Sequence, residues 1–131
     1  MHNAVSDRWT VALAETGWTP VVNFFIQRYA DLPEPITTPE AMLIIQLMLY
    51  KRDEKHPYPS FKTLGKRMGM TPTAARNHAR SLQRKGYLTR IVRKGDTNKF
   101  DLRPLFKVLE RHLAIVQADE AKKRIAKETE L

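Results

Sequence analysis

Basic and polar side chains recur on one side of residues 72–85, where a helix would present them together. They are Thr73, Arg76, Asn77 and Arg80. Arginine donates two hydrogen bonds to guanine and asparagine pairs with adenine, so this set has the chemistry that reads base edges in the major groove of DNA. The opposite side carries Ala75, Ala79 and Leu82 at three-to-four spacing, which is typical of a helix face that packs on a core. We therefore interpret residues 72–85 as a recognition helix.

The residues at both ends of this stretch predict where the helix begins and ends. Thr71 can accept a hydrogen bond from a free backbone N–H group, and Pro72 suits the first helical position, where its missing N–H costs nothing. Gly86 readily takes the left-handed conformation that ends a helix. Between them there is no Asp or Glu, whereas a solvated helix normally mixes acids with bases.

The net charge of +9 is distributed unevenly along the chain. Residues 51–100 carry fourteen lysines and arginines against three acids, whereas residues 1–50 carry two against five and residues 101–131 carry seven against six. The excess therefore lies on the segment that holds the recognition helix, and a concentrated basic patch attracts polyanions. Solubility alone would not require this segregation, so the distribution favours a nucleic-acid partner.

A second set of side chains suits the phosphates of a nucleic-acid backbone, as cations or as hydroxyl groups at helix N-termini. These residues are Ser60, Lys62, Lys66, Arg67, Thr71, Arg84, Arg93 and Lys94. For any one of the cations the alternative is an ordinary solvated side chain. For Asn77 the alternative is a surface residue without a role.

The elements upstream of the basic segment are predicted to be helical. Apolar side chains at helical spacing predict a short helix over residues 21–30, and three prolines make residues 32–39 a loop. Thr37, followed three residues later by Glu40, has the pattern of a capping box. The helix that it opens, residues 41–52, is apolar nearly all round, which predicts burial on more than one side.

Residues 61–68 form the next predicted helix, with Ser60 as its cap and Gly69 as its end. A tight turn then leads into Thr71, which gives the order helix, turn, helix.

After the recognition helix the pattern changes to that of a β-hairpin. Residues 87–92 contain β-formers interleaved with polar side chains, residues 94–98 are a polar turn with a glycine, and residues 99–102 return as a second strand. A basic hairpin in this place is called a wing, and we expect it to follow the DNA backbone.

The two ends of the chain carry weaker signals. Residues 1–16 fit a short strand or helix that packs on the domain, or else a loose arm. Pro104 starts a last helix, in which Leu113 and Val116 lie far enough along an apolar stripe to meet a second chain. We expect a homodimer through these two residues, and a solvated helical tail that frays beyond Gln117.

The run YPSFKTLGKRMGMTPTAARNHARSLQRKGYL, followed by NKFDLRPL, resembles the winged helix-turn-helix domains of bacterial phage and plasmid replication initiators and related regulators. The residues that match the pattern of those families are Pro59 and Ser60, residues 65–69, Thr71, residues 82–88 and residues 98–100. The resemblance covers residues 37–109 and implies a winged-helix fold that binds DNA. One departure is that Ala75 stands where those families usually have a larger aliphatic residue, and Ala79 is also small. We therefore expect the recognition helix to lie closer than usual to its neighbours.

Several classes of chemistry are excluded or disfavoured by the sequence. The chain has no cysteine, which excludes disulfides and thiolate metal sites, and its four histidines have no acid at ligand spacing that would join two of them. No phosphate-binding loop, HExxH motif or nucleophile elbow is present. We expect no catalytic residue, no metal and no cofactor. No stretch reads as a signal peptide or a membrane span, which predicts a cytoplasmic, nucleoid-associated protein.

These observations predict a mainly α protein in three parts. Residues 1–36 are an N-terminal extension packed on the core, residues 37–103 a winged helix-turn-helix domain, and residues 104–131 a C-terminal helix. The predicted function is sequence-specific binding of double-stranded DNA, as a transcription regulator or as a replication or maintenance factor of a plasmid, phage or other mobile element. The alternative is a winged-helix module for protein interaction or RNA binding, without specific DNA readout.

Overall fold

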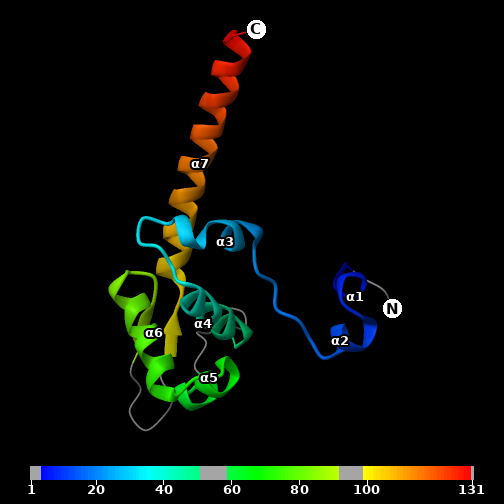
Figure 1. Cartoon of the computed structure of the whole chain (residues 1–131), viewed down its shortest axis with the longest axis vertical. Coiled ribbons are helices and arrows are strands. Elements are labelled where there is room, and N and C mark those ends of the chain that lie inside the picture. The colour runs from blue at the N-terminus through cyan, green and yellow to red at the C-terminus, as the bar shows by residue number, and fades with distance from the viewer. Residues whose placement is uncertain (1–3, 51–58, 92–98, 131) are drawn as a thin grey trace.

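The computed structural model describes residues 4–50, 59–91 and 99–130. Its elements follow the order α1 (Ala4–Arg8), α2 (Val11–Glu15), α3 (Asn23–Arg28), η1 (Tyr29–Asp31), α4 (Thr38–Leu49), α5 (Phe61–Met68), α6 (Pro72–Arg84), β1 (Thr89–Ile91), β2 (Lys99–Asp101) and α7 (Arg103–Glu130). In Figure 1, α4, α5, α6 and the two strands form one body, from which α7 rises and the N-terminal arm extends to one side. The prediction of a mainly α fold with a small hairpin is confirmed.

Local capping chemistry sets the start of each helix in the body. The predicted capping box is present, since the Thr37 N–H donates to Glu40 Oε1 at 2.9 Å and the Glu40 N–H donates to Thr37 Oγ1 at 3.3 Å. Ser60 Oγ accepts from the Thr63 N–H at 3.1 Å, and Thr71 Oγ1 accepts from the Ala74 N–H at 3.1 Å.

Two glycines end the helices of the helix-turn-helix in the way the sequence predicts. Gly69 follows α5 with φ of 68°, and Gly86 follows α6 with φ of 84°. Both lie in the left-handed region, which costs glycine little because it has no Cβ. α4, by contrast, ends at Leu49 rather than at the predicted Arg52, and residue 52 itself lies outside the described residues.

The wing is a two-stranded antiparallel sheet in which Thr89 pairs with Asp101 and Arg90 pairs with Phe100. Its predicted turn, residues 94–98, lies outside the described residues. Asp101 also starts the following helix, because its Oδ1 accepts a hydrogen bond from the Arg103 N–H at 2.9 Å. The wing and α7 are therefore joined without a loop.

One apolar core holds the body together, and it draws on α3, η1, α4, α5, α6, β2 and α7 and on the segments between them. Its most deeply buried side chains are Leu32, Ile36, Leu43, Leu47, Leu64, Leu82, Tyr87, Phe100 and Leu105. Ala75 and Ala79 are fully covered, which confirms that this side of α6 faces inward. The prediction that α4 is buried on several sides is only partly right, because Met42 and Leu49 are exposed.

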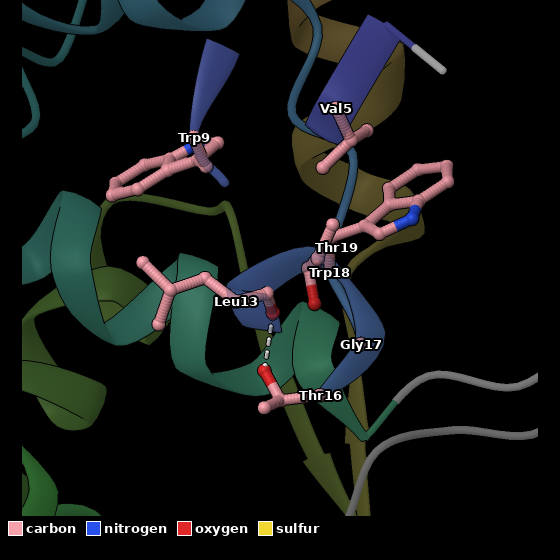
Figure 2. Close-up of a pocket in the computed structure, with 8 residues that line it drawn as sticks. Val5, Trp9, Leu13, Thr16, Gly17, Trp18 and Thr19 are labelled. Carbon is pink, nitrogen blue, oxygen red and sulfur yellow. Dashed lines mark hydrogen bonds between the residues drawn. The ribbon is translucent and has the colours of Figure 1, made fainter. Parts of the chain in front are cut away.

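The N-terminal arm forms two short helices, α1 and α2, which contact each other. Figure 1 shows them apart from the body, connected to α3 by an extended segment. An open hollow of about 350 Å³ lies on the arm, and Figure 2 shows the side chains of Trp9 and Trp18 among those that line it. The Thr16 hydroxyl closes the end of α2 by donating to the Leu13 carbonyl at 2.6 Å.

The last helix continues through the predicted helical tail. α7 runs unbroken to Glu130, and its second half extends beyond the body in Figure 1. The tail has neither glycine nor proline, and its acids and bases stand at positions that allow pairing along one face, as for Glu120 and Arg124. The absence of helix breakers and the spacing of opposite charges account for the helix in this tail, which contributes no side chain to the core that the structure describes.

Candidate nucleic-acid interface

The outward side of α6 carries the side chains that were predicted to read bases. Thr73, Asn77 and Arg80 are exposed, as is Arg84 near the end of the helix. Arg76 differs, because it is only half-exposed. The sequence of α6 contains no acidic residue, so this face offers cations and neutral hydrogen-bonding groups without any negative charge.

Arg76 is half-covered because its guanidinium lies over the ring of Phe61, the first residue of α5. The distance from Arg76 Cζ to the ring centre is 5.3 Å. A second guanidinium, that of Arg90 on β1, lies 5.2 Å from the same centre. Phe61 itself is 8% exposed and packs edge-on against Phe100 of β2. One aromatic ring thus joins α5, α6 and both strands of the wing.

Electrostatics at this junction disfavours the charged form of Arg90. Burial lowers the pKa of its guanidinium, and the positive charges of Arg76 and Arg80 lower that pKa further. Arg76 and Arg80 stand four residues apart on α6, so they are neighbours on one face. Three arginines therefore gather where the helix meets the wing.

The predicted phosphate contacts have two structural outcomes. Lys62, Lys66 and Arg67 are exposed on α5, and the Arg67 guanidinium lies 5.0 Å from the centre of the Tyr50 ring. Ser60 and Thr71 use their hydroxyl oxygens to cap α5 and α6. The other two predicted cations, Arg93 and Lys94, lie outside the described residues. The assignment of individual residues to bases or phosphates stays a prediction.

A buried ion pair fixes the end of α6 against the start of α4. Lys85 Nζ lies 2.6 Å from Glu40 Oε1 and donates to the Pro35 carbonyl at 2.8 Å. Glu40 is 2% exposed, and burial alone would raise the pKa of its carboxyl group. Hydrogen bonds from Lys85, Ser81 and the Thr37 backbone, with the charge of Lys85, outweigh burial and lower that pKa below its usual value.

Two further features hold α6 in place from its two ends. At its start, a Cβ atom added to Gly65 would lie 2.7 Å from the Met70 carbonyl oxygen, so the turn of the helix-turn-helix passes directly over this glycine. Just past its end, the hydroxyl group of the buried Tyr87 accepts a hydrogen bond from the Glu34 N–H at 3.2 Å and donates one to the Glu34 carbonyl. The close approach at Gly65 agrees with the small residues on the inner side of α6.

Sequence reasoning missed the part that Phe61 and Arg90 play in this interface. Phe61 has the pattern of an ordinary core residue, and Arg90 is one of the polar side chains interleaved with β-formers in residues 87–92. That interleaved pattern predicted a strand. It did not identify the ring that lies beneath Arg90.

The described residues show no grouping of three or more His, Asp or Glu side chains that could hold a metal ion. Among the helices of residues 4–50, 59–91 and 99–130, none is both long enough and apolar enough to cross a membrane.

Comparison with known proteins supports this geometry. A family model described as "Helix-turn-helix domain" matches residues 34–88, the segment that contains α4, α5 and α6. This segment has the fold of a helix-turn-helix domain. The complete chain is similar in fold to the N-terminal domain of the DnaD protein from Geobacillus kaustophilus HTA426, with a TM-score of 0.66 and 21% sequence identity over 93% of this chain and 99% of that chain. No match was found among curated protein sequences.

The match and the geometry together confirm the predicted winged helix-turn-helix fold. The helix-turn-helix domain supports a DNA-binding role for the chain.

Proposed function

We propose that the protein binds double-stranded DNA in a sequence-specific manner and places the first turns of α6 in the major groove. The observation that carries this proposal is the outward side of α6, which is exposed, basic and free of acids, on the second helix of a helix-turn-helix domain. The wing strands lie beside α6 at the Phe61 junction, from which the hairpin can follow the backbone.

The exposed residues of α6 divide by chemistry into base readers and phosphate contacts. Thr73 and Asn77 face outward in the first half of the helix, where a recognition helix meets base edges, and Arg80 is exposed next along the same side. Asn77 suits adenine and Arg80 suits guanine. Lys62 and Lys66 extend from α5 and suit phosphates, which position the protein without reading sequence.

We place this activity in the cytoplasm, on the nucleoid, without catalysis. The role is that of a transcription regulator, or of a replication or maintenance factor of a plasmid, phage or other mobile element. Two observations support a role in replication or regulation. Residues 37–109 resemble domains of replication initiators and regulators, and the fold is similar to that of the N-terminal domain of DnaD.

The proposal includes a homodimer formed through α7. Leu113 and Val116 are half-buried, and Ile115 beside them is 57% exposed. A second copy packed along this part of α7 would cover these side chains, and a pair of recognition helices could then reach successive grooves. Sedimentation of the wild type and of Leu113→Asp would test it, with a monomeric wild type as the contradicting result.

The test of specific readout begins with selection of a preferred site from random duplexes. Asn77→Ala should then lose about 1–3 kcal/mol on the selected site and much less on a scrambled duplex. The matched control is Lys66→Ala, a phosphate contact, which should weaken binding to both duplexes alike. Selection that yields no preferred site, or equal losses for the two variants on both duplexes, would contradict sequence-specific binding.

A further inference from the structure

The N-terminal arm exposes three large apolar side chains. Trp9 is 71% exposed, and Leu13 and Trp18 are exposed as well, although the arm has only two helices of five residues each. Helices this short are marginal in water, and exposed apolar patches mark sites of interaction. In Figure 1 the arm stands apart from the body, so the surface that would cover these side chains must come from elsewhere.

The body has an apolar hollow of about 240 Å³ where α3, α4 and α7 meet, which we call the body hollow. Its lining includes Val21, Phe25, Ile44, Met48, Leu105 and Leu109, together with Val22, which is 66% exposed. Apolar cavities of about 150 Å³ are large enough to hold benzene, so the body hollow has room for an indole ring. Met48 suits such a ring, because its thioether sulfur makes favourable contacts with aromatic groups.

The arm of the same chain is directed away from the body hollow. Pro20, Val21 and Val22 follow the arm directly and form part of the wall of the hollow. A proline favours an extended conformation in the residue before it, so Thr19 continues the chain outward. Figure 1 shows the segment between α2 and α3 running away from the body. A second copy of the chain, by contrast, can bring its arm to the hollow from outside.

The area that two exchanged arms would cover agrees with the size of a stable interface. One tryptophan side chain buries about 150–250 Å². Two arms bring four indole rings, which bury about 600–1,000 Å² on the arms and a similar area on the surfaces that receive them. The total of about 1,200–2,000 Å² is that of a specific protein–protein interface.

We propose that the Trp9 side chain of each copy enters the body hollow of a second copy, so that the arms are exchanged within a homodimer. This inference rests on the homodimer of the proposed function and deepens it by naming the surfaces that meet. Leu109 of the hollow stands four residues before Leu113 on α7, so both lie on one face of that helix. The exchanged arm and the α7 contact then form one continuous interface.

Sedimentation equilibrium of variants of the whole chain measures the dissociation constant of the dimer. Trp9→Ala removes the ring that fills the hollow and should raise this constant by at least about 30-fold, as for a central tryptophan of an interface. Val22→Asp places a charge beside the hollow and should weaken the dimer in the same way. Aspartate is a favourable N-cap, so this variant keeps the start of α3. The matched control is Ile125→Ala, an exposed apolar side chain on the tail of α7, which should change the constant by less than about twofold.

Cross-linking determines whose hollow the arm occupies. The chain has no cysteine, so Ala12→Cys on the arm and Val22→Cys at the body hollow each provide a unique thiol. Chains that carry one or the other substitution are mixed and treated with a short bismaleimide, which should link the two variants to each other. Ala12→Cys mixed with Lys62→Cys, on the exposed side of α5, is the control and should link far less. Thermal unfolding of each variant verifies that the fold is intact.

Three results would overturn the exchange. In the first, Trp9→Ala dimerises as tightly as the wild type, which leaves the α7 homodimer without a role for the arm. In the second, Ala12→Cys and Val22→Cys become linked only when both are in one chain, which places the arm in its own hollow. In the third, the wild type is a monomer, which contradicts the homodimer itself. Failure of DNA binding has a separate signature, since the wild type would then bind no duplex while its sedimentation remains that of a dimer.

Discussion

Gly65→Ala tests whether the close contact between α5 and the turn sets the position of the recognition helix. The added Cβ would lie 2.7 Å from the Met70 carbonyl oxygen and 3.0 Å from two atoms of Thr71. Carbon and oxygen rarely approach closer than about 3.3 Å, so the turn would have to move by roughly 0.6 Å. The atoms that must move are backbone, and Thr71 is the cap of α6.

The expected net cost combines two opposing effects. Overpacking a buried site costs about 1–3 kcal/mol, and a contact with backbone belongs in the upper half of that range. Alanine in place of glycine inside a helix raises the free energy of unfolding by about 1 kcal/mol, because alanine has the higher helix propensity. We therefore expect Gly65→Ala to lower the free energy of unfolding by about 1–2 kcal/mol.

Urea denaturation followed by far-UV circular dichroism measures this change. Lys62→Ala, on the exposed side of the same helix, is the control and should stay within about 0.5 kcal/mol of the wild type. Because the turn moves α6, Gly65→Ala should also weaken DNA binding. A Gly65→Ala protein more stable than the wild type by about 1 kcal/mol would refute the reasoning, since that is the result for a helical glycine with free space around it.

Two further predictions concern the contacts that hold the far end of α6. The lowered pKa of Glu40 means that its ionised form stabilises the fold above pH 4.5, its usual value, and that this contribution is lost as the pH falls through the lower pKa of the folded state. The difference in unfolding free energy between wild type and Glu40→Gln, measured in urea, should therefore be largest at pH 7 and shrink towards pH 3, and a constant difference would contradict it. Tyr87→Phe removes both hydrogen bonds to the Glu34 backbone and should cost about 1 kcal/mol in the same assay, whereas no change would show that water replaces them fully.

The helices of the body could be predicted because their boundaries depend on local chemistry. Thr37, Ser60 and Thr71 each accept a hydrogen bond from a backbone N–H that no other residue can satisfy, and Gly69 and Gly86 take a conformation that other residues avoid. These effects act within four residues of the chain, so the sequence contains them directly.

What could not be predicted depends on contacts between distant residues. The Glu40–Lys85 pair and the stacking of Arg76 and Arg90 on Phe61 join separate elements, and no spacing rule relates them. The tail of α7 was predicted as a solvated helical end from its polar composition, and the structure has helix there to Glu130, while fraying stays a prediction. Periodicity predicted correctly which side of α6 faces outward. It could not predict that the Arg76 guanidinium lies over the ring of Phe61.

The central claim is that the protein binds duplex DNA through α6, and one measurement tests it most directly. Fluorescence anisotropy with a labelled random duplex, at salt concentrations from about 50 to 200 mM, should show a steep loss of affinity with salt, as expected when several phosphates are neutralised. Asn77→Ala with Arg80→Ala should bind the selected site no better than this random duplex. Absence of binding by the wild type at the lowest salt would contradict the account.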